Sequence, residues 1–396
     1  MNAYIVNSRK TIEPFGDAPR DCLIGNQTLK ASQASVLKSL NIDYVTVDEA
    51  DIPDQDEHLI LTDSLYFNQE LLADFISRSR ELKRNTVCAL KTGVSTIRTI
   101  VATQDVAIYD DRVEYDLHYV PSISRRGETV PVVIEGGRLK ESLRMPEHLT
   151  DSPGYDIPLP YKVAIQIDHW ANLWSANMVS LLAPVAKLMQ TPKWKLLGAA
   201  LRAGSLNQWK VAGKLNRIGR NCDIHPAAYV EGSVVGDNVI IGAGSVVREC
   251  NLADNVSIEN NVTLNFVVIG TGGYIADGSI IRYSLIYPDT FFGFSTLSCQ
   301  TLGRNSFIGD GVTLTDYRFD GQNITVVKNG AVIDTGNRIL GSCVGHDSYL
   351  AAGSVVSPGR AIPNGTRITP EECRFIQEVP GHGAVPGYRL VKKKQT

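Results

Sequence analysis

The sequence has 396 residues, of which 43% are hydrophobic and 20% are charged, a balance that excludes a globally disordered chain. The net charge of -3 argues against a general nucleic-acid-binding protein, so no nucleic-acid partner is expected. The seven cysteines form no C-x-x-C pair, which excludes a zinc knuckle and a disulfide framework. Because the chain also shows no secretory signal and no apolar run long enough to span a bilayer, we expect a cytoplasmic protein.

The first part of the chain, residues 1–165, alternates strand-like and helix-like segments. This alternation predicts an α/β domain with a Rossmann-like open sheet, in which ligands bind at the carboxyl ends of the strands. The expected elements are a strand over residues 3–6, a helix over 27–40, a strand over 58–61 and a helix over 65–82.

Three short motifs in this domain follow the order found in sugar nucleotidylyltransferases: Pro19-Arg20, Gly25-Asn26 and Leu61-Thr62-Asp63. The domain thus resembles a trimmed member of that family. The resemblance implies that Arg20, Gly25 and Asn26 bind a sugar phosphate or sugar nucleotide and that Asp63 binds Mg²⁺, although Asp63 would equally serve as a helix cap. The family's glycine-rich phosphate loop is replaced by residues 7–12, whose Cβ atoms should keep the backbone N–H groups away from a pyrophosphate.

Residues 166–215 form a predicted helical connector that is basic and rich in tryptophan. It contains all four tryptophans, and the stretch from His169 to Cys222 has eight Lys or Arg and no Asp or Glu. The segment 169–182 resembles the helix that links the two domains in nucleotidylyltransferases, which favours packing between domains. Segment 184–214 also fits an amphipathic helix on an anionic membrane surface, which would make the protein peripheral to the inner face of the membrane, or a partner-binding helix.

Apolar residues recur at fixed intervals in the second half of the chain, residues 216–371. One set is spaced by 17 residues: Ile218, Val235, Leu252, Ile269 and Ile286. Within each interval, further aliphatic residues follow at six-residue spacing. An inward side chain on every sixth residue predicts a triangular coil, and coils stacked at the strand spacing of about 4.8 Å give a parallel β-solenoid. A helix would need a 3.6-residue period.

Two segments fall outside the repeat. Residues 315–338 are polar and contain glycine, which predicts a loop that leaves the solenoid and carries ligand chemistry. Residues 372–396 form a C-terminal tail.

The repeat and this loop together resemble the hexapeptide-repeat left-handed β-helix acyltransferases. The match is most specific in the R-F-D-G motif that begins at Arg318, in Lys328, in the D-T-G-N-R motif that ends at Arg338, and in the V-G pair that ends at Gly345. This order is similar to the carboxy-terminal half of the bifunctional sugar-1-phosphate nucleotidylyltransferase/amino-sugar-1-phosphate acetyltransferases.

This resemblance implies a homotrimer in which acetyl-CoA, or another acyl-CoA, lies between neighbouring solenoids. The acyl-CoA would contact Gly345, Ala351 and Ala352. Arg318, Lys328 and Arg338 would bind the sugar phosphate, since a guanidinium or ammonium group pairs well with phosphate.

The chain departs from this family at the general base. The family's His-x-x-Tyr pair is absent, because the corresponding segment 293–296 reads Gly-Phe-Ser-Thr, and the family's asparagine before R-F-D is Asp316 here. We therefore take Asp316 and His346 as the candidate catalytic residues, with a surface position at a coil corner as the alternative for His346.

Three functions follow from these observations. The first is an acyltransferase that acts on an amino sugar or a sugar phosphate. The second is a non-catalytic sugar-nucleotide-binding or scaffold protein, which the missing His-x-x-Tyr pair and glycine loop favour. The third is a peripheral membrane adaptor that acts through the basic connector.

Overall fold

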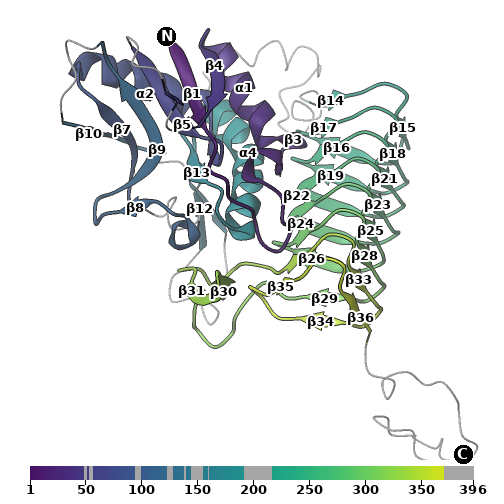
Figure 1. Ribbon diagram of the computed structural model, residues 1–396. Helices are drawn as coiled ribbons and strands as arrows, with labels where there is room; N and C mark the ends of the chain where they lie inside the picture. The colour runs from purple at the N-terminus through teal and green to yellow at the C-terminus, as the bar shows by residue number, and fades with distance from the viewer. Residues whose placement is uncertain are drawn as a thin grey trace, which may run out of the picture.

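The computed structural model describes residues 1–48, 51–52, 57–93, 100–122, 128–137, 140–143, 155–158, 160–190 and 216–369. Figure 1 shows an α/β domain in purple and blue beside a β-helix in green and yellow, with helix α4 (Trp170–Gln190) between them. The connector residues 191–215 and the tail 372–396 lie outside the described residues, so membrane contact stays a prediction. None of the helices in the described residues is long and apolar enough to cross a membrane.

The N-terminal domain contains a seven-stranded sheet. Its strands are β1 (Asn2–Val6), β4 (Asp43–Val47), β5 (His58–Thr62), β7 (Thr86–Lys91), β8 (Ala107–Ile108), β9 (Arg112–Val120) and β10 (Val130–Ile134). The main order is β10-β7-β9-β5-β1-β4. Strand β1 is parallel to both β4 and β5, whereas β9 is antiparallel to β5 and β7, so the predicted α/β sheet is present as a mixed sheet.

The remaining elements of this domain lie outside the seven-stranded sheet. They are the 3-10 helices η1 (Pro19–Asp21) and η3 (Val101–Thr103), the strands β2 (Leu23–Ile24), β3 (Gln27–Thr28), β6 (Leu65–Phe67), β11 (Lys140–Leu143), β12 (Tyr155–Pro158) and β13 (Ala164–Gln166), and the helices α1 (Leu29–Ser39) and α2 (Gln69–Leu82).

The prediction of a helix over residues 65–82 was wrong at its start. The first three residues form β6, which pairs antiparallel with β13, about 100 residues later. Helix α2 begins only after Asn68, whose side chain accepts a hydrogen bond from the Leu71 N–H at 3.2 Å and caps the helix. A partner strand that is distant in sequence therefore overrides the local helical pattern.

The second half of the chain is a parallel β-helix, and the 17-residue repeat sets its register. Ile218 pairs with Val235, Val235 with Leu252, Leu252 with Ile269, and Ile269 with Ile286. The stacked parallel strands fit the predicted left-handed β-helix. The first face contains β14 (Arg217–Ile218), β17 (Val234–Val235), β20 (Asn251–Leu252), β27 (Thr301–Leu302), β32 (Cys343–Val344) and β35 (Ala361–Ile362). The second face contains β15 (Asp223–Ile224), β18 (Ile240–Ile241), β21 (Ser257–Ile258), β23 (Tyr274–Ile275), β25 (Phe291–Phe292), β28 (Phe307–Ile308), β33 (Tyr349–Leu350) and β36 (Arg367–Ile368).

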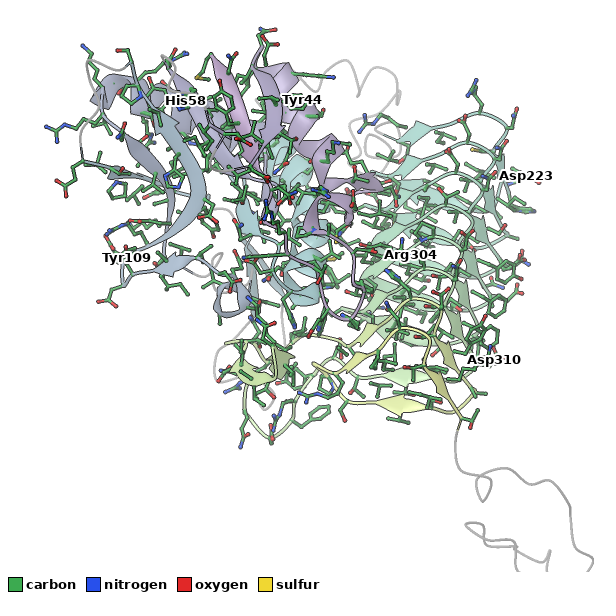
Figure 2. All side chains as sticks on the ribbon, in the orientation of Figure 1. Tyr44, His58, Tyr109, Asp223, Arg304 and Asp310 are labelled. Atoms are coloured by element: carbon green, nitrogen blue, oxygen red, sulfur yellow. The ribbon has the colours of Figure 1, made fainter. Side chains whose placement is uncertain are left out.

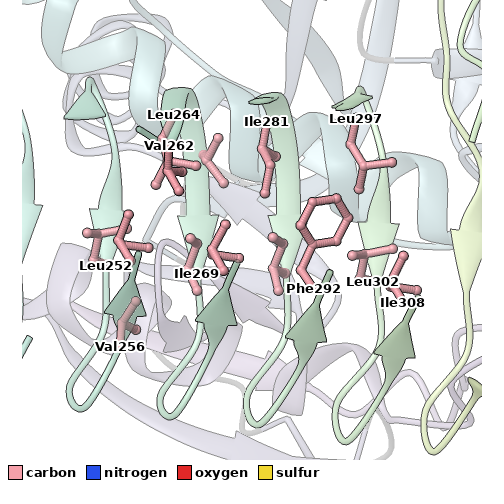
Figure 3. Close-up of a cluster of buried hydrophobic side chains, with 14 of the residues drawn as sticks. Leu252, Val256, Val262, Leu264, Ile269, Ile281, Phe292, Leu297, Leu302 and Ile308 are labelled. Carbon is pink, nitrogen blue, oxygen red and sulfur yellow. The ribbon is translucent and has the colours of Figure 1, made fainter. Parts of the chain in front are cut away.

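The third face contains β16 (Tyr229–Glu231), β19 (Val246–Arg248), β22 (Thr263–Ile269), β24 (Ile280–Ile286), β26 (Thr296–Ser298), β29 (Thr313–Leu314) and β34 (Val355–Val356), of which β22 and β24 continue into the first face. The repeating side chains fill the interior of the coil, and Figure 3 shows rows of them, among them Leu252, Ile269 and Leu302. Burying one such side chain contributes about 1.5–3 kcal/mol to folding.

Residues 315–338 follow β29 and contain an antiparallel hairpin, β30 (Thr325–Lys328) with β31 (Ala331–Asp334). Val326 of the hairpin and Ile324 directly before it are buried in the same core as Ile165 and Trp170 of the N-terminal half. The hairpin therefore packs against the N-terminal domain and the connector helix.

Candidate functional site

The carboxyl ends of β1 and β5 form the first candidate site. The chain leaves β1 toward β4 on one side and returns to β5 on the other, and such a switch point is where open α/β sheets bind ligands. The predicted Asp63 directly follows β5 and is buried, and one of its oxygens accepts a hydrogen bond from the Ser8 N–H at 2.9 Å. The Arg20 guanidinium lies 3.7 Å from the other oxygen, so the structure brings these two predicted residues together.

Two polar groups next to Asp63 were missed by the sequence analysis. The Gln166 amide donates to the Thr62 hydroxyl at 2.9 Å and to the Ser64 hydroxyl at 2.6 Å, while its Oε1 atom is buried without a hydrogen-bond partner in the described residues. The same holds for the Ser8 hydroxyl. Buried polar atoms are normally paired, so these two unpaired atoms mark an unusual polar spot behind Asp63. No local pattern marks Gln166, since its neighbours at this edge lie about 100 residues away in sequence.

The loop after β1 does not offer a phosphate cradle. The N–H groups of Asn7, Ser8 and Arg9 donate to the Val47 carbonyl, the Asp63 carboxylate and the Asn7 side chain respectively. A phosphate nest needs successive N–H groups that point outward. The expectation that this loop cannot hold a pyrophosphate thus has a second physical reason, because the first three of its N–H groups already have partners within the protein.

Asp63 also does not fit a Mg²⁺ site. Magnesium prefers several oxygen ligands, whereas here one carboxylate oxygen is occupied by a backbone donor and the other faces a guanidinium. Among the residues that the structure describes, no three His, Cys, Asp or Glu side chains are grouped to hold a metal ion. We therefore derive no step through Mg²⁺.

The predicted turn Gly25-Asn26 lies at the domain interface rather than at this sheet edge. The Asn26 side-chain amide donates to Asn251 and to the Ile269 carbonyl of the β-helix, at 2.9 and 3.0 Å. The Gly25 N–H donates to Asn177 of α4. Gly25 has a φ of +58°, a left-handed conformation that glycine adopts without strain.

Residues 12–26 form a segment that we call the strap, which runs along one face of the β-helix. Besides Asn26, the Leu23 N–H donates to the Tyr287 hydroxyl at 3.1 Å, and the Phe15 ring stacks on Tyr287 with centroids 5.4 Å apart. The Asn364 side chain donates to the Phe15 carbonyl at 2.8 Å. The strap therefore joins the two halves of the chain through specific contacts.

His346, a predicted catalytic residue, is buried under the strap. Its Nδ1 accepts a hydrogen bond from the Arg304 N–H at 2.9 Å, and its Nε2 lies 3.1 Å from the Asp17 carboxylate, which also pairs with the Arg304 guanidinium. The Phe15 ring stacks on the imidazole at 4.6 Å. Figure 2 shows Arg304 on the side of the β-helix that faces the N-terminal domain. Both ring nitrogens are thus engaged, Nδ1 with Arg304 of the same β-helix and Nε2 with Asp17 of the strap.

Backbone hydrogen bonds bring the segments that carry Asp316, Arg318 and Arg338 together at the base of the loop. The Arg318 N–H donates to the Arg338 carbonyl at 3.4 Å, and the Leu340 N–H donates to the Asp316 carbonyl at 3.0 Å. Burial raises the pKa of the Asp316 carboxyl, and the neighbouring Ser298 hydroxyl offsets part of that shift. The Arg318 guanidinium is held by Asp320 in the exposed tip.

Lys328, the third predicted phosphate ligand, points to the N-terminal domain. Its ammonium group donates to the Thr103 carbonyl at 2.7 Å and to the Asp105 carboxylate at 2.6 Å. It does not join Arg318 and Arg338. The three residues predicted to contact acyl-CoA lie at two corners of one coil, with Gly345 buried after β32, and Ala351 half-buried and Ala352 exposed after β33.

His169 fixes the hairpin to the start of α4. Its Nδ1 accepts the Ala171 N–H at 3.2 Å, and its Nε2 lies 3.2 Å from the Val327 carbonyl, which requires the neutral ring with a proton on Nε2. Burial lowers the pKa of His169 to about 4. In the unfolded chain the pKa of His169 is near 6.5. Between pH 6.5 and 4, His169 is therefore protonated in the unfolded chain and neutral in the folded protein.

We predict that the free energy of unfolding falls by up to about 3 kcal/mol as the pH drops from 6.5 to 4, since one pKa unit corresponds to about 1.4 kcal/mol. His169→Asn should lose part of this pH dependence. Urea unfolding at pH 7 and pH 4.5 measures it, with the exposed His225→Asn as the matched control. An unchanged pH dependence in His169→Asn would contradict the assignment.

The sequence matches no protein-family model and no curated protein. Among solved structures, it is similar to a hexapeptide transferase family protein from Anaplasma phagocytophilum, with 18% identity over 38% of this chain and 76% of that one and a TM-score of 0.20. It is also similar to a Bacillus cereus protein described as an acetyltransferase, with 17% identity over 38% of this chain and 77% of that one and a TM-score of 0.17. Both likenesses are too remote to indicate a function by themselves.

Proposed function

We propose that the protein is an acyltransferase that transfers an acyl group from coenzyme A to an amino or hydroxyl group of a sugar phosphate. The observation that carries the proposal is the half-buried Asp316 carboxylate beside Ser298, at the base of a loop that bears Arg318 and Arg338. A carboxylate with a raised pKa is a better general base than an exposed one.

Asp316 is the better-placed base of the two candidates, because His346 uses both ring nitrogens for contacts within the protein. In the proposed reaction, Asp316 takes the proton of the acceptor amine or hydroxyl while that atom attacks the thioester carbonyl. The bond between the carbonyl carbon and sulfur then breaks, and the proton that Asp316 took passes to the leaving sulfur, so that coenzyme A leaves as the thiol and Asp316 is again a carboxylate. Arg318 and Arg338 would hold the phosphate of the acceptor.

We include in the proposal the homotrimer and the acyl-CoA groove between its β-helices that the sequence resemblance implies. One face of each β-helix is covered by the strap and α4, as the burial of Val268, Leu285 and Tyr287 shows. A groove between protomers would therefore use the other two faces, and the exposed Ala352 lies at the corner between them.

Binding of acetyl-CoA tests this proposal. Calorimetric titration with acetyl-CoA up to millimolar concentration should show saturable binding, and Ala352→Glu should weaken it at least tenfold by placing a carboxylate against the acyl donor. Ala243→Glu is the matched control, since Ala243 occupies the equivalent corner position several coils earlier. Absence of binding to the unaltered protein would remove the proposal.

A scaffold role is the second candidate for the N-terminal domain. Two observations favour it: the N–H groups of Asn7, Ser8 and Arg9 are used within the protein, and the Gly25-Asn26 turn is docked on the β-helix. In that case the domain would stabilise and orient the β-helix without transferring a nucleotidyl group.

A further inference from the structure

Four charged side chains alternate across the contact between the hairpin and the N-terminal domain. The Lys328 ammonium donates to Asp105 at 2.6 Å, Asp105 also accepts from Lys10 at 2.9 Å, and Lys10 donates to Asp168 at 2.7 Å. The second oxygen of Asp168 accepts the Asp105 N–H at 2.8 Å. We call these four residues the relay; its two cations and two carboxylates balance in charge.

The relay is shielded from water at its two ends. The side chains of Lys328 and Asp168 are 10% and 1% exposed, so their charges need partners within the protein. Burial opposes the charged form of Lys10, but its bonds to Asp168 and Asp105 outweigh burial and raise its pKa. The two middle side chains, Lys10 and Asp105, are 37% and 52% exposed, so water weakens the bond between them more than the bond of Lys10 to the buried Asp168.

The hairpin is in turn connected to the base of the loop. The Ile324 N–H donates to the Asn337 carbonyl at 2.7 Å, and the Thr335 hydroxyl donates to the Ile324 carbonyl at 2.7 Å. Asn337 directly precedes Arg338, whose carbonyl accepts the Arg318 N–H. Movement of the hairpin would therefore move the segment that carries the two arginines.

We propose that the relay makes the N-terminal domain a positioning element for residues 315–338, the loop that would bind the acyl acceptor and that we call the acyl-acceptor loop, with Lys328 and Asp105 as positioning residues. Lys328 thus acts through the place of the hairpin and does not bind the acceptor phosphate. The inference rests on the proposed function for its effect on the reaction, but the fixing of the hairpin can be measured without any reaction.

Hydrogen exchange of the hairpin amides tests the relay in the full chain. Lys328→Met and Asp105→Asn should each lower the protection of residues 325–334 by about 10- to 100-fold, as expected for the loss of a charge-assisted hydrogen bond. Lys328→Arg should restore most of it. Val332→Thr, at a position 70% exposed on the same hairpin, is the control and should leave protection unchanged. Unaltered protection in both Lys328→Met and Asp105→Asn would overturn the proposal.

Steady-state kinetics separate positioning from a purely structural role. Lys328→Met and Asp105→Asn should raise KM for the acceptor and leave KM for acetyl-CoA unchanged, whereas an equal rise for both substrates would contradict positioning of the acceptor loop. If the unaltered protein transfers no acyl group, the proposed function fails, while the fixing of the hairpin is still decided by hydrogen exchange.

Discussion

Replacing Asp316 by asparagine is expected to lower kcat for acyl transfer by about 10²- to 10⁴-fold, the usual contribution of a positioned general base. The amide has nearly the same shape as the carboxylate but cannot accept the acceptor's proton. Since burial raises the pKa of Asp316, the rate of the unaltered protein should rise with pH through a pKa above the ordinary range of an aspartate. Thiol release from acetyl-CoA measures both effects.

The control for this variant is Asp289→Asn, which makes the same chemical change at an exposed corner of the β-helix. Asp289 has a φ of +56°, a conformation that asparagine also tolerates, so the fold should be retained. A fully active Asp316→Asn protein with an unchanged pH profile would show that another group takes the proton.

Replacing Phe15 by alanine should destabilise the docking of the two halves by about 3–5 kcal/mol, as is typical of a buried Phe-to-Ala change. Phe15 is 3% exposed and stacks on both Tyr287 and His346, so its removal leaves a cavity under the strap and exposes the bonds of Asp17. Thermal unfolding followed by calorimetry should show an earlier transition for the N-terminal domain, separated from that of the β-helix.

Phe294→Ala provides the comparison, because Phe294 is 59% exposed on an outer corner of the β-helix. Substitutions at such positions usually change stability by less than about 0.5 kcal/mol. Similar unfolding curves for Phe15→Ala and the unaltered protein would mean that the strap contributes little to domain docking.

The β-helix was predictable because its core is a repeated local event. Each coil places its own inward residues, such as Leu252, Ile269 and Ile286, at the same position of the interior, so the packing produces a regular spacing of apolar residues in the sequence. The alternation of strands and helices in the N-terminal domain was predictable for a similar reason, because it too follows from hydrophobic patterns within short segments. Two helix starts were wrong: Gln27–Thr28 form the short strand β3 before α1, and Leu65–Phe67 form a strand whose partner β13 is distant in the chain.

The role of individual site residues was less predictable, because it depends on single long-range contacts. Arg20 lies near Asp63, and backbone hydrogen bonds bring together the segments that carry Asp316, Arg318 and Arg338, but the roles of these residues stay predictions. Lys328 carries the same motif signal, yet its partner Asp105 is 223 residues away and belongs to the other domain. Such pairs follow no period, and nothing in the local sequence distinguishes an ion pair from a phosphate ligand.

The strap sets a limit on how this β-helix can change. Its contacts follow six consecutive strands of one sheet, from Asn251 on β20 to Asn364 after β35, which corresponds to about 24 Å at the usual strand spacing. A solenoid ordinarily tolerates the gain or loss of a whole repeat, because each coil contacts only its neighbours. Here the strap has a fixed length and fixed contact points. One coil more or fewer between Asn251 and Asn364 would misalign every later contact, so we expect relatives that keep the strap to keep the number of coils beneath it.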